Sequence, residues 1–268
     1  MREYSIITGA SGLLGQQHAI ALAEAGFNLV LTDIDYLNLD KVQKKIQKKF
    51  NSQKIISYPI DITIEQEIIK MKNFLKNKKI KISVLVNNAA MNPKMKEINK
   101  NAKTGDIESY SLNLLRKELD VNLISAFSMI KHFGSEMAKN KKGSIINIGS
   151  DLSVNAPDQS VYSKDDIIKK VKNFKPIGYS ISKFGIVGLT KYVATYWAHK
   201  NVRCNALIPG AVDNNQLNYL KKNVSKRIPL GRWAKKDEYK KGLVFLAKDD
   251  SSYMTGQLLI MDGGRSTW

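Results

Sequence analysis

The chain has 268 residues, of which 43% are hydrophobic, and it carries a formal net charge of +19. It contains no run of about 18 apolar residues, so we expect no transmembrane helix. A strand-like segment starts at Tyr4, which leaves no room for a signal peptide, and the lone Cys204 cannot form an internal disulfide. The expected location is therefore the cytoplasm.

The first predicted unit consists of a strand, a glycine-rich turn and a helix. Residues 4–8 have the pattern of a buried strand, and apolar residues at helical spacing begin at Leu14. Glycine permits a tight turn with close backbone approach, and a helix N-terminus offers free N–H groups to a pyrophosphate. An isolated glycine triplet also occurs in ordinary turns, but in this context it predicts dinucleotide binding. The expected cofactor contacts are Gly9, Ser11, Gly12, Leu13, Leu14 and Gly15.

The second predicted strand, residues 28–32, ends at Asp33, which lies 24 residues after Gly9. This is near the distance at which an acidic side chain meets the hydroxyls of the adenosine ribose. Residues 31–40 contain no Lys or Arg to receive a 2′-phosphate, so the sequence favours NAD over NADP, with Asp33 and Ile34 as cofactor contacts. The alternatives are that Asp33 caps a helix, or that Asp35 takes the ribose.

The next predicted elements bring polar residues to strand ends. A basic helix over about residues 39–50, a strand over 54–58 and a helix over 64–75 precede a strand over 82–86. Asp61, with Ile62, is expected to contact the adenine or to start the helix. The fourth strand runs into Asn88, Ala89 and Ala90, where a polar amide and two small side chains suit a ligand crevice. Residues 91–105 are interpreted as a loop.

A long helix is predicted over about residues 107–133, because apolar residues recur along one stripe. Asn122 lies on that stripe. A buried Asn costs free energy unless it is hydrogen-bonded, which favours a functional role over simple packing. The following strand, residues 144–148, leads to Ser150, which is expected either to point into the substrate crevice or to cap a turn.

Tyr179 and Lys183 lie four residues apart in the next predicted helix, so they share one helix face. A nearby ammonium favours the ionised form of a phenol, and Lys183 is therefore expected to lower the pKa of Tyr179 towards neutrality. Such a phenol takes a proton from an alcohol or returns one to a carbonyl oxygen. The pair also occurs by chance on helices, so its significance depends on a cofactor and an oxyanion donor elsewhere in the chain.

The remaining elements complete one repeating α/β pattern over residues 1–268. Residues 151–178 form an insert before Tyr179, with a helical-looking part at 164–174. A strand over 201–208 leads to Pro209, Gly210 and Val212, and the polar segment 213–227 is a candidate mobile lid. A helix over 235–248 and a strand over 257–261 end the pattern. His18 has no second His or Cys near it, so we expect it to pack and predict no metal site.

The ordered set of motifs resembles the short-chain dehydrogenase/reductase family over nearly the whole chain. The resemblance implies a single Rossmann-like domain with a doubly wound, seven-stranded parallel sheet, assembled into homotetramers or dimers. It implies an oxidoreductase that interconverts a secondary alcohol and a ketone with NAD or NADP. The motifs are the glycine turn, Asn87-Asn88-Ala89-Ala90, Asn122, Ser150, Tyr179 with Lys183, and Pro209-Gly210.

The resemblance also implies a role for each residue at the reacting end. Tyr179 would be the general acid/base, and Lys183 would lower its pKa and hold the nicotinamide ribose. Ser150 would stabilise the reacting oxygen, and Asn122 would support a water between Lys183 and solvent. Val212 would meet the carboxamide through its backbone, while hydride transfer itself is the cofactor's chemistry.

Three features depart from the usual family pattern. Leu13 stands where many members have Gly or Ala, and the loop after Asn88 is long. The separation of Ser150 and Tyr179 by 29 residues is unusually large. Tyr162 lies inside this insert, but an Asp rather than a Lys follows four positions later, so Tyr179 is the better catalytic candidate.

The expected partner is a small-molecule substrate, and its identity is the open question. The insert is rich in lysine, and residues 155–159 resemble members associated with surface sugars such as nonulosonic acids. This suggests a polar, sugar-like substrate, and the lysines are compatible with an anionic one. A FabG-like 3-oxoacyl thioester reductase is the alternative. An RNA-binding protein on a Rossmann scaffold is the alternative from another class, but the lysines are scattered, so nucleic acid is not the expected partner.

Overall fold

The computed structural model describes residues 3–92, 105–170 and 174–268. All seven strands are parallel and form one sheet in the order β3-β2-β1-β4-β5-β6-β7. This confirms the predicted doubly wound, single-domain sheet. The strands are β1 Tyr4–Thr8, β2 Asn28–Thr32, β3 Ile55–Ser57, β4 Ile82–Asn87, β5 Gly143–Ile148, β6 Val202–Pro209 and β7 Leu258–Met261.

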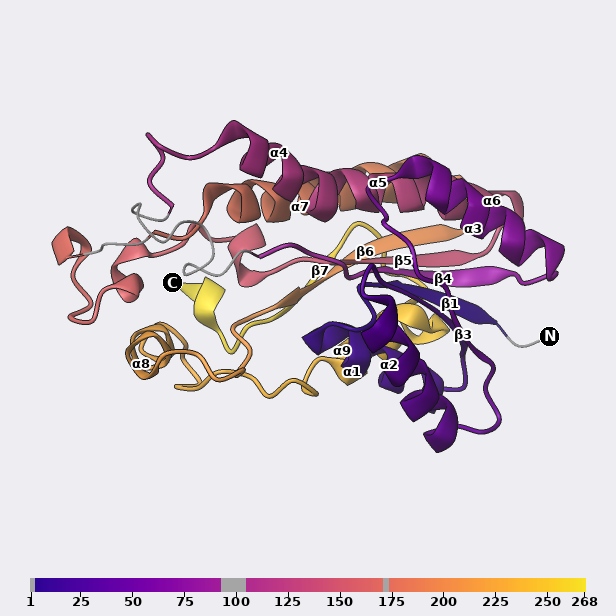
Figure 1. Ribbon diagram of the computed structural model, residues 1–268, viewed down its shortest axis with the longest axis horizontal. Coiled ribbons are helices and arrows are strands. Elements are labelled where there is room, and N and C mark those ends of the chain that lie inside the picture. The colour runs from indigo at the N-terminus through magenta and orange to yellow at the C-terminus, as the bar shows by residue number, and fades with distance from the viewer. Residues whose placement is uncertain (1–2, 93–104, 171–173) are drawn as a thin grey trace.

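Helices cover both faces of the sheet (Figure 1). One face carries α1, α2 and α9, and the other carries α3, the segments α4, α5 and α6, and α7, while α8 lies beyond the end of the sheet. The bounds are α1 Leu13–Glu24, α2 Tyr36–Lys49, α3 Glu65–Asn77, α4 Leu112–Leu119, α5 Ser125–Met129, α6 Ser135–Lys139, α7 Ile177–Trp197, α8 Asn218–Ser225 and α9 Lys240–Ala247.

The central strands read as continuous apolar runs because both of their faces are buried. Successive side chains in a strand point to opposite faces, so neighbours enter different cores. In β1, Ile6 belongs to the core under α3, while Ile7 belongs to the core under α1 and α2. In β2, Val30 joins the first of these cores and Leu29 the second. A parallel sheet covered in this way is built mainly from apolar residues, and the buried polar exceptions, such as Asn147 and Asn205, are hydrogen-bonded.

The direction of strand addition reverses between β1 and β4. From β1 the chain adds β2 and β3 on one side, and then crosses to add β4 to β7 on the other. In open α/β sheets, ligands bind outside the carboxyl ends of the strands at such a switch point. The fold therefore directs attention to the glycine turn after β1, the Asn88 segment after β4 and Ser150 after β5.

Three segments differ from the secondary structure predicted for them. The helix expected over 107–133 begins only at Leu112, where Ser111 caps it, and continues to Lys139 through two π-helical turns, Asp120–Ile124 and Ile130–Gly134. The polar segment 213–227, which has no clear pattern in the sequence, contains α8.

The helical-looking stretch 164–174 is not a helix in its described part. It contains one 3-10 turn, Ile168–Lys170, and residues 171–173 lie outside the described residues. Asp166 has a φ of 59°, a left-handed conformation that ends helical propagation there. Most of the expected loop 91–105 also lies outside the described residues. Among the described helices, none is both long and apolar enough to cross a membrane.

Candidate active site

A cavity of about 1160 Å³ lies along the carboxyl ends of the strands. One end is lined by Asp33 and Asp61, and the other by Ser150, Tyr179 and Lys183. Every residue predicted to bind the cofactor lines this cavity, and of the four predicted catalytic residues only Asn122 does not. The lining cofactor candidates are Gly9, Ser11, Gly12, Leu13, Leu14, Gly15, Asp33, Ile34, Asp61, Ile62, Asn88, Ala89, Ala90, Tyr179, Lys183, Pro209, Gly210 and Val212.

The glycine turn is shaped by close backbone contacts that exclude side chains. Gly9 has a φ of 62°, and a Cβ added there would lie 2.7 Å from the Cα of Ala89. A Cβ on Gly15 would overlap the carbonyl oxygen of Gly9. Gly12 begins α1 without a side-chain cap, so the first N–H groups of the helix face the cavity. This backbone surface fits the pyrophosphate of a dinucleotide.

Asn88 fixes the turn from the neighbouring strand. Its Nδ2 donates to the carbonyl oxygens of Thr8 and Gly9 at 2.9 and 3.0 Å. Its Oδ1 lies 3.1 Å from Nδ1 of His18, which therefore donates the proton. Burial lowers the pKa of His18 to about 4, so this ring is neutral. Asn88 and His18 thus hold the turn in shape, in agreement with the packing role expected for His18.

Asp33 and Asp35, which follow the carboxyl end of β2, have different hydrogen-bond partners. Asp35 caps α2, since its Oδ1 accepts from the backbone N–H of Asn38 at 3.0 Å. Asp33 instead accepts from the backbone N–H of Ser11 at 2.9 Å and lines the cavity. Asp33 is therefore joined to the glycine turn at the cavity wall.

Asp61 lines the same end of the cavity while organising its own loop. Its Oδ1 accepts from the backbone N–H and the hydroxyl of Thr63 at 2.9 and 2.7 Å. Its backbone N–H donates to Glu67 of α3 at 2.7 Å. Asp61 is not the cap of α3, because Ile64 is the N-cap and has no side-chain cap hydrogen bond, so the helix-start interpretation is wrong.

At the other end, α7 presents Tyr179 and Lys183 to the cavity. Nζ of Lys183 is buried and donates to the carbonyl oxygen of Ile148 at 2.7 Å. The Tyr179 side chain is hydrogen-bonded to Ser150, which follows β5. Ser150 also donates to the carboxylate of Asp151 at 2.8 Å. Strand β5 and helix α7 therefore bring together the serine, tyrosine and lysine that the sequence separates by up to 33 positions.

The expected lowering of the Tyr179 pKa is not found in this arrangement. Burial raises the pKa of Tyr179 to about 12, an effect only partly opposed by the hydrogen bond to Ser150. Burial lowers the pKa of Lys183 to about 8. The ammonium of Lys183 lies 5.7 Å from the centre of the Tyr179 ring, directed at Ile148 rather than at the phenol oxygen. Desolvation therefore outweighs attraction between the two groups.

Asn122 lies within the first π-helical turn and not in the cavity wall. Its Oδ1 accepts from the backbone N–H of Met91 at 2.6 Å, and its Nδ2 donates to Met91 O and Ser182 Oγ, both at 3.0 Å. The amide thus links the end of the β4 segment to α7, one residue before Lys183. This gives the buried Asn the defined partners that its position requires.

The chain is similar to known proteins along its whole length. A family model described as enoyl-(acyl carrier protein) reductase matches residues 9–266. The chain is 30% identical to the 3-oxoacyl-(acyl-carrier-protein) reductase FabG of Thermotoga maritima, across 97% of this chain and 96% of the relative. The chain belongs to the short-chain dehydrogenase/reductase family.

Other similarities agree with this family. The chain is 29% identical to the 2-dehydro-3-deoxy-D-gluconate 5-dehydrogenase of Pseudoalteromonas atlantica, across 97% of this chain and 94% of the relative. A crystal structure described as a putative gluconate dehydrogenase from Agrobacterium tumefaciens superposes with a TM-score of 0.86 at 25% identity, covering 99% of this chain and 96% of that one. This short-chain dehydrogenase/reductase is an oxidoreductase acting on CH–OH groups with NAD or NADP. The comparisons give no support to the RNA-binding alternative.

Sequence reasoning missed an ion pair at the reacting end of this short-chain dehydrogenase/reductase. Asp151, directly after Ser150, is buried, and its Oδ2 accepts from Arg265 Nη1 at 2.5 Å. Both residues line the cavity. They lie 114 positions apart, and nothing local in the sequence connects them. The one available signal was the adjacency of Asp151 to Ser150.

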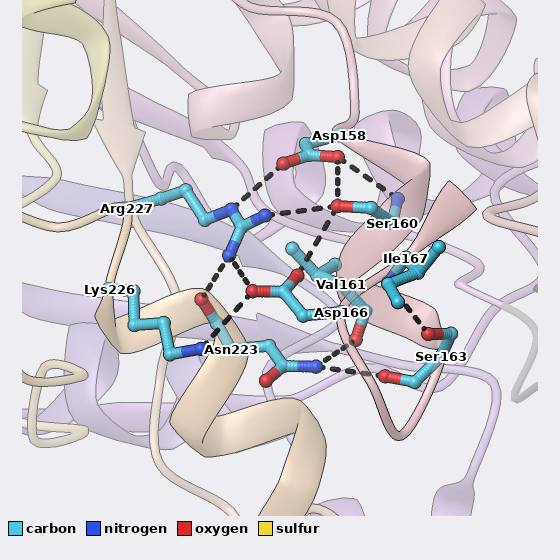
Figure 2. Close-up of polar contacts among 9 residues, drawn as sticks. All are labelled: Asp158, Ser160, Val161, Ser163, Asp166, Ile167, Asn223, Lys226 and Arg227. Carbon is cyan, nitrogen blue, oxygen red and sulfur yellow. Dashed lines mark hydrogen bonds and ion pairs between the residues drawn. The ribbon is translucent and has the colours of Figure 1, made fainter. Parts of the chain in front are cut away.

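The insert is tied to the segment 213–227 by a polar cluster around Arg227, shown in Figure 2. Arg227 donates to Asp158 at 2.8 Å, to Asp166 at 2.6 Å and to Ser160 at 2.9 Å. Asn223 of α8 donates to the backbone carbonyls of the insert at Val161 and Ser163. Under this cluster, Val161 packs with Val224, Ile228 and Trp233. The candidate lid therefore packs against the insert rather than lying free.

We expect Arg227→Met to loosen this contact and weaken substrate binding. Removing a guanidinium that makes several partly buried hydrogen bonds leaves Asp158 without an ion pair and Asp166 with only the exposed Lys226. The free energy of unfolding should therefore fall by about 2 kcal/mol. KM should rise more than kcat falls. Chemical denaturation and steady-state kinetics measure both effects. The matched control is Lys226→Met, which removes one exposed pair to Asp166 at 3.3 Å and should change stability by less than about 0.5 kcal/mol. Equal effects of the two variants would contradict this role for Arg227.

Proposed function

We propose that this enzyme is an NAD(H)-dependent dehydrogenase of a polar, polyhydroxylated, sugar-like alcohol. The observation that carries the proposal is the charge at the reacting end of the cavity. Asp151, Lys175 and Arg265 line it beside Tyr179, and charged groups of this kind suit a substrate rich in hydroxyl groups better than a hydrocarbon chain. Two similar proteins described above bear the names of enzymes acting on sugar acids.

The residues of the chain divide the reaction as follows. The oxidised cofactor supplies the hydride acceptor when bound. Ser150 hydrogen-bonds the reacting oxygen, and Tyr179 takes the alcohol proton during oxidation or returns it during reduction. Lys183 holds its charge beside the tyrosine and the nicotinamide ribose. Asn122 keeps α7 in register through Ser182, and supports a water between Lys183 and solvent.

The glycine turn, Asp33 and the strand ends are proposed to hold the cofactor. The turn binds the pyrophosphate, Asp33 binds the adenosine ribose with Ile34 beside it, and Asp61 with Ile62 meets the adenine. Asn88, Ala89 and Ala90 border the central part, and Pro209, Gly210 and Val212 border the nicotinamide. Among the described residues that line the adenosine end there is no Lys or Arg, so a 2′-phosphate would meet the carboxylate of Asp33 and no basic side chain. This supports NAD over NADP.

Asp33→Asn should shift cofactor preference towards NADP. The carboxylate repels a 2′-phosphate and accepts hydrogen bonds from a 2′-hydroxyl. Its removal should therefore weaken the binding of NAD and relieve the repulsion of NADP. A change of about 2 kcal/mol corresponds to a roughly thirtyfold shift in the ratio of kcat/KM for NAD to that for NADP. Asp40→Asn, which removes an exposed carboxylate from α2, is the matched control. An unchanged ratio in Asp33→Asn would show that Asp33 does not select the cofactor.

A two-arm assay tests the proposed function. In one arm, sugar alcohols and sugar acids are oxidised with NAD and NADP; in the other, 3-oxoacyl thioesters are reduced with NADH and NADPH. Turnover of a polyhydroxylated substrate with NAD, at a kcat/KM above that for any thioester, is expected. Activity confined to the thioesters would establish the second candidate, a FabG-like reductase. That candidate is favoured by the 30% identity to the Thermotoga maritima enzyme.

We also propose assembly into a homodimer or homotetramer in the cytoplasm. Large apolar side chains are exposed on the outer faces of α5 and α7, including Phe127, Phe184 and Tyr192 at 51%, 46% and 67% exposure. Exposed apolar side chains of this size suit contact with a second copy. The buried, free Cys204 is compatible with a reducing compartment. Sedimentation of the purified protein measures the assembly state, and a monomer would contradict the first proposal.

A further inference from the structure

Lys175 lies against the catalytic tyrosine at the wall of the cavity. Its Nζ lies 4.3 Å from the centre of the Tyr179 ring, closer than the Nζ of Lys183 at 5.7 Å. The backbone N–H of Lys175 donates to Gln159 at 2.9 Å, and Pro176 follows as the N-cap of α7. The side chain is thus anchored between the insert and α7, and it lines the cavity at the reacting end.

The ammonium of Lys175 has no carboxylate bound to it among the described residues. Its Nζ donates to the neutral amide oxygen of Asn92 at 2.7 Å. The two carboxylates that attract it from a distance, Asp151 and Glu118, have partners of their own. Asp151 is paired with Arg265, and Glu118 accepts from the hydroxyl of Tyr110 at 2.6 Å. Lys175 therefore brings a positive charge to the cavity wall that the surrounding described residues do not neutralise.

The other two basic side chains at this end already have partners. Arg265 forms its ion pair with Asp151, and Lys183 donates to the carbonyl oxygen of Ile148. Withdrawing a charge from water is unfavourable unless a partner compensates it, and burial accordingly lowers the pKa of Lys175 to about 8. An anion entering the cavity would supply the missing partner. It would lie beside the ring of Tyr179.

We propose that Lys175 binds a carboxylate of the substrate and so makes this enzyme selective for sugar acids over the corresponding sugar alcohols. The inference rests on the proposed function, because it names the substrate class within the polyhydroxylated compounds. The proposed contact is a charge-assisted hydrogen bond from Nζ to a carboxylate oxygen. Lys175 is thereby a specificity-determining residue, while Tyr179 and Ser150 act on the reacting hydroxyl.

The test compares matched pairs of ligands that differ only in the carboxylate, namely D-gluconate with D-sorbitol and D-glycerate with glycerol. Binding to the NADH-loaded enzyme is measured by calorimetry, and kcat/KM is measured with NAD. For at least one pair the wild type should prefer the acid in both measurements. Lys175→Met should reduce this preference by at least tenfold, the effect of losing one hydrogen bond to a charged group. Lys164→Met removes an exposed lysine of the same insert and should leave the preference within twofold.

The outcomes separate the proposed contact from other roles of Lys175. If Lys175→Met lowered kcat/KM equally for the acid and the alcohol, the proposal would be overturned, because the effect would then arise from the ionisation of Tyr179. An unchanged preference in Lys175→Met, or a wild type that binds no acid more tightly than its alcohol, would also overturn it. Turnover of neither class would refute the proposed function, whereas the binding measurement would still decide whether Lys175 recognises a carboxylate.

Discussion

Tyr179→Phe should lower kcat by about a thousandfold while leaving cofactor binding within a few-fold of the wild type. The substitution removes only the hydroxyl that is hydrogen-bonded to Ser150 and keeps the ring that packs at the cavity wall. General acid–base catalysis contributes roughly 10² to 10⁴ in rate, so the loss should fall within that range. NADH fluorescence measures cofactor binding, and absorbance at the nicotinamide band measures turnover.

Tyr162→Phe is the matched control, because Tyr162 also lines the cavity and belongs to the unusual insert. Burial raises the pKa of its phenol, and its side chain packs against the cluster of Val161, Val224 and Trp233. We expect its loss to change kcat by less than tenfold. If Tyr162→Phe abolished turnover and Tyr179→Phe did not, Tyr162 of the insert would be the catalytic tyrosine instead of Tyr179.

Lys183→Met should remove nearly all activity and yet stabilise the cofactor-free protein at pH 7. Burial lowers the pKa of Lys183 from 10.5 to about 8, which corresponds to a penalty of about 3 kcal/mol for the charged form. The lost hydrogen bond to Ile148 offsets about 1 kcal/mol of this. The variant should therefore be more stable by about 2 kcal/mol, while kcat falls by at least about a hundredfold.

The stability difference should depend on pH in a defined direction. Below about pH 8 the lysine is protonated in both the folded and the unfolded state, so the wild type bears the whole penalty. Between about pH 8 and 10.5 the folded lysine is neutral while the unfolded one is still protonated, so the stability of the wild type rises relative to the variant. Denaturant titrations at pH 7 and pH 10 measure the difference. Lys191→Met, an exposed lysine on α7, should show no such trend, and a variant less stable than the wild type at pH 7 would contradict the burial argument.

The parts of the site that sequence predicts are those fixed by local chain geometry. Gly9 and Gly15 are required because backbone atoms occupy the space of their side chains. Asp33 and Ser150 follow directly from strands whose ends meet at one edge of a parallel sheet. The tyrosine and lysine of α7 share a face because of helical spacing alone. Each of these inferences needs only a few consecutive residues, and the structure places all of them along one cavity.

The parts that sequence did not predict depend on contacts between distant segments. Arg227 meets Asp158 and Asp166 across 69 and 61 positions, and the helical interpretation of residues 164–174 did not anticipate such an ion cluster. Lys175 was one of several lysines in the insert, and nothing in their spacing distinguishes it from exposed Lys164. The pKa of Tyr179 depends on how deeply the fold buries it, which no spacing reveals.

The joining of two cavity walls through Arg227 has a consequence for redesigning substrate selectivity. Residues 151–178 and 213–227 come from different parts of the chain, yet the guanidinium and Asn223 bind one to the other. A chimaera that receives only the first segment from a relative would leave Arg227 facing foreign side chains. Grafts that exchange both segments as one cassette preserve the contact, so libraries aimed at new substrates should recombine these two stretches together.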